Sequence, residues 1–349
     1  MPALRIAVAG AGLIGQRHVQ LVQASPQCQL SAIVDPAPAA AIVAEQAGVP
    51  LYASLGQLFA AQNVDGVILA TPNQLHVEQA LACVEAGVGA LIEKPVAHTL
   101  AEGERLVEVV RGRDSKLLVG HHRAHSPILE QARGIIEQGR LGPLVSVMGS
   151  ALLYKPADYF DTAWRCQPGG GPILINLIHE IGNLRSLCGE VLAVQAMVSN
   201  ERRGHAVEDT AAITLRFASG ALGTFMLSDA AASARSWEQT SGENPDYPNS
   251  ADEDCYVITG TRGSLAVPTM RLKQFAADEP GSWFKPLASE TLELKRADPL
   301  QRQLAHFCAV LRGEAAPLVN VRDGLQNLRV VEAIGQAARL GSTAQVAQA

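Results

Sequence analysis

The segment Ile6-Ala7-Val8-Ala9-Gly10-Ala11-Gly12-Leu13-Ile14-Gly15 decides the fold of the first part of this chain. It joins a short apolar run, typical of a buried strand, to the pattern G-x-G-x-x-G and then to a segment of helical period. Gly10 permits a tight turn, Gly12 lets backbone N–H groups approach a pyrophosphate, and Gly15 allows a helix to pack closely on a strand. We therefore predict a phosphate-binding loop between a first strand and a first helix.

The same alternation of short apolar runs and helical segments continues to Gly120. Parallel strands need crossover connections, so the alternation predicts an α/β Rossmann domain with a doubly wound parallel sheet over residues 1–122. The expected strands are Arg5–Ala9, Leu30–Asp35, Gly66–Ala70, Ala90–Glu93 and Lys116–Gly120.

The pattern changes after His122, and residues 123–341 form a second expected domain. Apolar and polar residues alternate strictly in its strand-like runs, which is typical of antiparallel sheets. We predict an α+β domain with a mainly antiparallel open sheet, in which Arg235–Asp254 is a long loop and a candidate lid. The expected strands include a run from Val145 to Leu153, Val191–Ser199, Thr210–Phe217, Ala221–Leu227, Tyr256–Thr259 and Ser264–Val267. Two C-terminal helices, near Pro299–Arg312 and Arg322–Leu340, are free to pack back on the first domain.

The composition excludes several classes of protein. The chain has 349 residues, of which 48% are hydrophobic and 18% charged, so it is not disordered as a whole. Its formal net charge of −6, spread along the chain, is not that of a protein that binds nucleic acid or an anionic membrane. The six cysteines form no C-x-x-C pair and no apolar run reaches the length of a membrane span, so we expect a cytoplasmic protein with reduced thiols.

Asp35 indicates which dinucleotide the loop binds. It ends the second expected strand 20 residues after Gly15, where a carboxylate accepts hydrogen bonds from a ribose and repels a 2′-phosphate. The residues that follow, Pro36-Ala37-Pro38, supply no cation for that phosphate, although Arg17 is near in sequence. The sequence therefore favours NAD over NADP.

Two further motifs follow expected strands at the edge where open α/β sheets bind ligands: Thr71-Pro72-Asn73-Gln74-Leu75-His76 and Glu93-Lys94-Pro95. Trp164-Arg165 and Gly169-Gly170-Gly171-Pro172 then lead to His179. With these motifs, nearly the whole chain resembles the Gfo/Idh/MocA family of oxidoreductases.

The resemblance implies an NAD(P)-dependent dehydrogenase that oxidises a secondary alcohol of a polyol, cyclitol, sugar or sugar acid. It also implies that the second domain covers the substrate site and carries the sheet used for oligomer contacts. The expected cofactor-binding residues are Gly10, Gly12, Leu13, Ile14, Gly15, Asp35, Thr71, Pro72, Asn73, His76, Glu93 and Lys94.

Three residues are candidates for catalysis. The Lys94 ammonium can stabilise alkoxide charge, and His179 can take the alcohol proton, because histidine titrates near neutral pH. The commonest family pattern has an aspartate four residues before this histidine, where this chain has Ile175. Asn176 is three residues from His179, on the helix face that we expect to point away from the core, and is the nearest replacement. The expected substrate-binding residues are Lys94, Arg123, Tyr154, Trp164, Arg165, Asn176 and His179.

Alternative functions remain open at this stage. Lys155, Arg123 and Arg165 could clamp the carboxylate of a cis-dihydrodiol from aromatic catabolism, which would make the protein a dehydrogenase for that substrate. A non-catalytic dinucleotide sensor on the same fold is the second alternative. We expect no metal, although His121-His122-Arg123-Ala124-His125 contains H-x-x-H, because no carboxylate or thiol cluster accompanies it. An apolar sheet face predicts a homodimer or homotetramer.

Overall fold

The computed structural model describes residues 2–113, 115–276 and 280–348. Contacts divide the chain into two compact units. The first contains Met1–His122 and Leu300–Leu328, and the second contains Arg123–Pro299 and Arg329–Ala349. The chain therefore crosses between the units three times, the last time inside helix α10 (Val321–Leu340).

The first unit contains a parallel sheet of six strands in the order β3-β2-β1-β4-β5-β6. The strands are β1 (Leu4–Ala9), β2 (Cys28–Val34), β3 (Leu51–Tyr52), β4 (Gly66–Leu69), β5 (Gly89–Glu93) and β6 (Leu117–Gly120). All five predicted strands are confirmed, and the two-residue β3 is an addition. The strand order reverses between β1 and β4, and ligands bind at the carboxyl ends of the strands on either side of such a switch point.

Helices connect these strands as the alternation predicts. They are α1 (Leu13–Ala24), α2 (Ala40–Ala47), α3 (Leu55–Ala61), α4 (His76–Glu85) and α5 (Leu100–Val110), with the 3₁₀ helices η1 (Asn73–Leu75) and η2 (His122–His125). Thr99 and Glu102 form the capping box at the start of α5, each side chain bonded to the other residue's backbone N–H. This cap fixes the start of the helix that follows the E-K-P segment.

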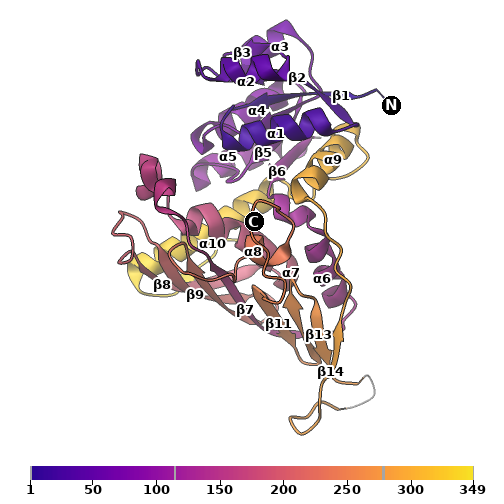
Figure 1. Cartoon of the computed structure of the whole chain (residues 1–349), viewed down its shortest axis with the longest axis vertical. Helices are drawn as coiled ribbons and strands as arrows, with labels where there is room; N and C mark the ends of the chain where they lie inside the picture. Colours follow the sequence, from indigo (N-terminus) through magenta and orange to yellow (C-terminus); the bar gives the residue numbers. More distant parts are fainter. Residues whose placement is uncertain (1, 114, 277–279, 349) are drawn as a thin grey trace. The chain divides into compact units, whose positions relative to one another are not determined.

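Helix α9 (Pro299–Arg312) completes the core of the first unit from the far end of the sequence (Figure 1). Phe307 and Leu311 are buried against Gly66 and Gly89, the first residues of β4 and β5. An ideal Cβ atom at Gly89 would overlap the Leu311 side chain, so a residue without a side chain is needed there. The first unit is thus built from two separate stretches of the chain.

The second unit contains a sheet of nine strands in the order β14-β13-β12-β11-β7-β10-β9-β8-β15. The pair β7–β10 is parallel and the other pairs are antiparallel, which confirms a mainly antiparallel sheet. The strands are β7 (Leu144–Leu152), β8 (Val191–Ser199), β9 (Thr210–Phe217), β10 (Leu222–Ser228), β11 (Tyr256–Gly260), β12 (Gly263–Val267), β13 (Arg271–Gln274), β14 (Ala288–Thr291) and β15 (Ala344–Gln345).

Helices cover one face of this sheet. Apolar residues of α6, α7 and the second half of α10, such as Leu129, Leu184 and Ile334, share a core with strand residues such as Ile213 and Phe225. The helices of this unit are α6 (Pro127–Glu137), α7 (Ile178–Cys188) and the short α8 (Trp237–Ser241), with the 3₁₀ helices η3 (Ala157–Asp161) and η4 (Ala163–Cys166) and the π-helix η5 (Ile173–Leu177). The side chains that alternate with these core residues along each strand point to the opposite face of the sheet.

The candidate lid, Arg235–Asp254, is anchored in this core by an aromatic side chain. Trp237, at the start of α8, is fully buried and stacks on Tyr256 with ring centroids 5.9 Å apart. Its large apolar ring stabilises the segment against β11.

Candidate functional site

The glycine loop has the geometry needed to hold a phosphate group. Gly10 has φ of +92°, and an ideal Cβ there would overlap the carbonyl oxygen of Ala70 after β4. Nothing lies within 4 Å of an ideal Cβ at Gly12, so the loop is open on that side. Helix α1 begins with no side-chain cap and no acidic residue in its first turn. Its N-terminal N–H groups and positive dipole end therefore suit an anionic ligand.

Asp35 ties the end of β2 to this loop. One carboxylate oxygen accepts from the backbone N–H of Ala11 at 2.8 Å, and the other accepts from Ala37 at 2.8 Å. Each oxygen keeps a second lone pair, so the carboxylate can still accept from ribose hydroxyls. Leu13 and Ile14 are exposed at the start of α1, where a bound dinucleotide would cover them. The residues present fit NAD.

The residues of the T-P-N-x-x-H motif differ in their exposure to solvent. Thr71, Pro72 and Asn73 are at least partly exposed after β4, and the Thr71 hydroxyl donates to Gln79 at 2.6 Å. His76, by contrast, is 1% exposed, and both ring nitrogens contact backbone carbonyl oxygens. The ring, an expected cofactor contact, joins the loop after β4 to the loop after β5.

Glu93, another expected cofactor contact, is also buried. It is 6% exposed, and its carboxylate lies 2.8 Å from Nε2 of His18 on α1. Burial raises the pKa of Glu93, but the hydrogen bond and charge of His18, with the charges of Lys94 and His122, outweigh burial and lower it to about 2. Lys94, next in the chain, is partly exposed.

The second unit brings Asn176 together with a buried lysine. The Lys155 ammonium donates to the Asn176 side-chain oxygen at 2.8 Å and pairs with Asp229 at 3.3 Å. Asn176 belongs to the π-helix η5, which runs into α7, and such irregular turns are frequent at functional sites. Arg203 pairs with the other Asp229 oxygen at 2.7 Å. Asn176 is thus held in one orientation by a buried ionic group.

His179 lies in α7 and is 7% exposed. The expectation that the polar face of this helix points away from the core is wrong, because Glu180 and Asn183 are buried as well. The Tyr256 hydroxyl donates to Glu180, and the Asn183 amide donates to the Tyr256 oxygen at 2.9 Å. Polar groups of the second unit, such as the Tyr256 hydroxyl, therefore cover the polar face of α7.

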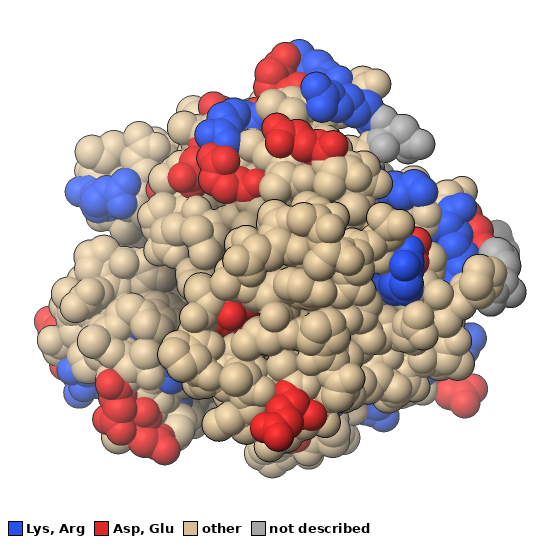
Figure 2. Space-filling model, turned by 90° about the horizontal axis from the view of Figure 1, so that it is seen from above, with Lys and Arg blue, Asp and Glu red and all other residues tan. Residues whose placement is uncertain are grey.

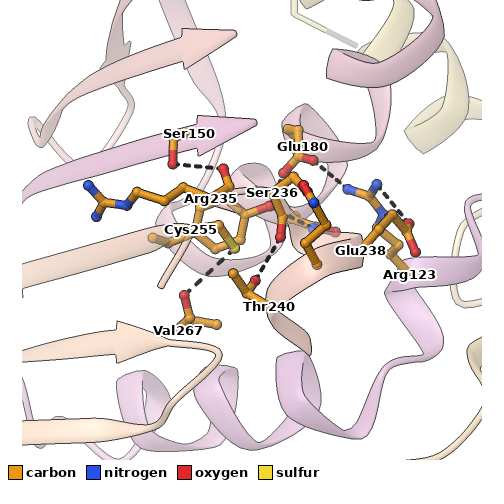
Figure 3. A network of polar contacts seen from close by, with 12 residues as sticks. Arg123, Ser150, Glu180, Arg235, Ser236, Glu238, Thr240, Cys255 and Val267 are labelled. Atoms are coloured by element: carbon orange, nitrogen blue, oxygen red, sulfur yellow. Dashed lines mark hydrogen bonds and ion pairs between the residues drawn. The ribbon is translucent and has the colours of Figure 1, made fainter. Parts of the chain in front are cut away.

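Arg123, an expected substrate-binding residue, lies in a buried ionic cluster. It is 6% exposed, and its guanidinium donates to Glu180 at 2.5 Å and to Glu238 at 3.0 Å (Figure 3). Burial would lower the pKa of Arg123, but the two carboxylates raise it above its ordinary value. The guanidinium is occupied by carboxylates of the chain itself, so Arg123 joins η2 to α7 and α8.

The aromatic loop before the glycine run is only partly a candidate surface. Tyr154 and Trp164 are 65% and 53% exposed. Arg165 stacks on Tyr159, with the guanidinium carbon 4.0 Å from the ring centroid, and donates to the Tyr159 carbonyl oxygen at 2.6 Å. Tyr154 and Trp164 can therefore reach a ligand, whereas Arg165 mainly orders the loop.

Several functional groups were missed by sequence reasoning. His18 lies three residues after Gly15 on the buried face of α1, and a histidine on an apolar stripe was the available signal. Arg203 and Asp229 follow the ends of strands β8 and β10, and no local pattern connects them with Lys155. Among the described residues, no three histidine, cysteine, aspartate or glutamate side chains gather as metal ligands would.

The site residues are divided between the units. Lys94 and the glycine loop belong to the first, and Asn176, Lys155 and His179 to the second. The first unit supplies backbone N–H groups for a phosphate, the Asp35 carboxylate for ribose hydroxyls, and the Lys94 ammonium. The second has a histidine and an oriented amide.

Comparisons with known proteins agree with this division. The model of the oxidoreductase family with an NAD-binding Rossmann fold matches residues 4–121, and that of its C-terminal alpha/beta domain matches residues 133–346. The chain is 23% identical over 337 residues to inositol 2-dehydrogenase of Rhizobium meliloti, covering 95% of both chains. The rhizopine catabolism protein MocA of Rhizobium meliloti is 31% identical over 193 residues, which span 54% of this chain and 59% of that protein.

A solved structure matches over the whole length. It is the WlbA dehydrogenase from Bordetella pertussis in complex with NADH and UDP-GlcNAcA, with a TM-score of 0.79, 27% identity and full coverage of both chains. Both domain models together cover nearly the entire sequence, and the glycine loop, T-P-N-x-x-H and E-K-P stand where the fold requires them. The chain belongs to the Gfo/Idh/MocA oxidoreductase family.

Proposed function

We propose that this protein is an NAD-dependent dehydrogenase that oxidises a secondary alcohol of a polyol, cyclitol, sugar or sugar acid. The observation that carries the proposal is one sheet edge on which an uncapped helix N-terminus, Asp35 and Lys94 follow the parallel strands β1, β2 and β5. Support for the substrate class comes from relatives named for inositol and for a complex with UDP-GlcNAcA.

Bound NAD supplies a nicotinamide ring that accepts hydride. The Lys94 ammonium hydrogen-bonds the reacting oxygen and stabilises the negative charge that develops on it. His179 takes the hydroxyl proton. Since Lys155 holds the Asn176 oxygen, the Asn176 amide nitrogen is turned to donate to a substrate oxygen. Asn176 thus orients the substrate in place of the aspartate that the commonest family pattern has at the position of Ile175.

The carboxylated dihydrodiol loses the observation on which it rested. Arg123 is paired with two glutamates, Lys155 with Asp229, and Arg165 with the ring and carbonyl of Tyr159. A substrate carboxylate would have to compete with these partners, so the three cations do not favour the dihydrodiol over a hydroxyl-rich substrate.

A substrate panel tests the proposal directly. Purified protein is mixed with NAD or NADP and with inositols, aldoses, aldonates, uronates or carboxylated dihydrodiols, and the absorbance of reduced nicotinamide is followed. Turnover with one group of polyols or sugars supports the proposal. NAD binding in a calorimeter without turnover of any compound would instead support the non-catalytic sensor.

Asp35→Ala should weaken NAD binding and relax discrimination against NADP. The carboxylate is placed to accept from ribose hydroxyls and to repel a 2′-phosphate, and its loss also frees the N–H groups of Ala11 and Ala37. We expect the ratio of the two dissociation constants to shift toward NADP by about 10-fold or more, measured by calorimetry. An unchanged ratio would mean that the ribose is held by other residues.

We also propose a homo-oligomer formed through the open face of the nine-stranded sheet. Met197, Met226 and Leu222 are 79%, 43% and 57% exposed, and Met148 is 58% exposed on the neighbouring β7. Met226 and Met197 both pair with Ala212, so Met226, Ala212 and Met197 form one row across β10, β9 and β8. A monomer rarely leaves such a row in water, and a second copy of the same face would cover it.

The variant Met148→Glu/Met226→Glu should dissociate this oligomer. Two carboxylates on each copy would have to be buried without partners, which opposes assembly. Sedimentation velocity should show a lower mass than the parent protein at the same concentration. Ile42→Glu, an exposed apolar position on α2, is the control and should keep the parent mass. Equal masses for all three proteins would exclude this face as the interface.

Charge supports small-molecule partners rather than polyanions. On the face shown in Figure 2, lysine and arginine side chains are mixed with aspartate and glutamate around a broad area of other residues. Nucleic acids and anionic lipids bind to extended basic surfaces. In the described part of the chain, no helix is long and apolar enough to cross a membrane. All six cysteines are free thiols, which is the usual state in the cytoplasm, and we place the protein there.

A further inference from the structure

We infer that two buried histidines, His18 and His76, are positioning residues for Lys94. The inference rests on the proposed function, in which Lys94 contacts the reacting oxygen. The two histidines hold the residues on either side of this lysine: His18 contacts Glu93, and His76 contacts Pro95. The position of the Lys94 backbone is thus fixed from both directions.

His76 holds the segment that follows Lys94. Nδ1 lies 2.7 Å from the carbonyl oxygen of Pro95, and Nε2 lies 2.9 Å from that of Thr71. The ring therefore lies between the loop after β4 and the loop after β5. With 1% of its surface exposed, His76 has no water to replace a lost partner.

His18 holds the other side of the segment. It is 2% exposed, and its Nε2 donates to Glu93 at 2.8 Å, while the second Glu93 oxygen accepts from the Lys94 backbone N–H at 3.2 Å. Gly120 packs directly on Glu93: an ideal Cβ there would lie 3.0 Å from the Glu93 Cα. The Glu93 carboxylate therefore has little room to move. Because it bonds both His18 and the Lys94 backbone, the position of α1 fixes the position of Lys94.

Each histidine belongs to an element that also borders the cofactor edge. His18 lies on α1, which begins at the glycine loop, and His76 begins α4, directly after T-P-N. The segments that would hold NAD are therefore connected to the segment that presents Lys94. Loss of either connection should displace the ammonium relative to the reacting oxygen while the phosphate loop stays intact. This predicts a change in kcat with little change in NAD affinity.

Kinetics on four variants and a control test the inference. His76→Phe and His18→Leu remove the N–H donors, His76→Gln and His18→Gln retain an amide donor, and His98→Gln changes an exposed histidine in the same loop. We expect kcat to fall about 10- to 100-fold in the Phe and Leu variants, less in the Gln variants, and not in the control. The NAD dissociation constant should change by no more than about threefold. A kcat within about twofold of the control for both donor-free variants would overturn the inference.

One measurement does not depend on turnover. The rate at which an amine reagent modifies Lys94, followed by mass spectrometry, should change in the variants relative to exposed Lys273. An unchanged rate in the Phe and Leu variants would contradict the inference. If the parent protein turns over no substrate, the proposed function fails, and this measurement alone decides whether the histidines position Lys94.

Discussion

His179→Ala should lower turnover by about 10²–10⁴-fold while leaving NAD binding nearly unchanged. His179 is the titratable side chain of the second unit nearest in sequence to the oriented Asn176 amide, and it is buried in a helix with little freedom. Without the imidazole, the proton of the alcohol has to pass to water. Steady-state kinetics with the substrate found in the panel, together with calorimetric titration of NAD, would measure both quantities.

The control for this variant is Asn183→Ala on the same helix. Asn183 is also buried, and its amide donates to Tyr256, so its loss should cost stability but leave the proton acceptor in place. Thermal unfolding of both variants separates folding from chemistry. If His179→Ala keeps near-full activity with every substrate that the parent protein oxidises, His179 does not accept the proton.

Arg123→Met should destabilise the second unit by about 3–5 kcal/mol, because it leaves two carboxylates without their cation. Glu180 has 1% of its side chain exposed and Glu238 has 21%, so water cannot fully replace the guanidinium. Figure 3 shows that the arginine lies between the two acids, which come from different helices. The free energy of unfolding, obtained from urea titration followed by circular dichroism, would measure the loss.

Arg339→Met is the matched control, since it removes an exposed arginine of α10 in the same unit. Exposed charges contribute little to stability, and we expect a change below about 1 kcal/mol. A loss of similar size for the two variants would show that the buried cluster contributes no more than an ordinary surface charge.

Most of the first unit could be predicted because its signals are local. The glycine loop, the five apolar strands and the capping box at Thr99 each depend on residues within a few positions of one another. The order of the strands then follows from the fold. In the second unit, strict alternation located the long strands of the sheet, whereas the short β13 and β14 were missed because they have too few residues to show a period.

The environments of single side chains could not be predicted. His76 and Glu93 stand in motifs that suggest ligand contact, but residues distant in sequence turn them inward. Arg123 is paired with Glu238, 115 positions away, and helical period gives no information about such a partner. The polar face of α7 is buried for the same reason. The roles of Lys94, Asn176 and His179 in catalysis are predictions, and His179→Ala tests that of His179.

The return of α9 to the first unit has a consequence for biosynthesis. The ribosome delivers the N-terminus first, and the six-stranded sheet is complete in sequence by Gly120. Its core, however, lacks Leu304, Phe307, Cys308 and Leu311 until nearly the whole chain has emerged. Until then the nascent sheet exposes apolar surface around Gly66 and Gly89, a state in which chaperones bind and aggregation begins. The unit whose synthesis begins first therefore cannot complete its core until residues 300–328 have been made.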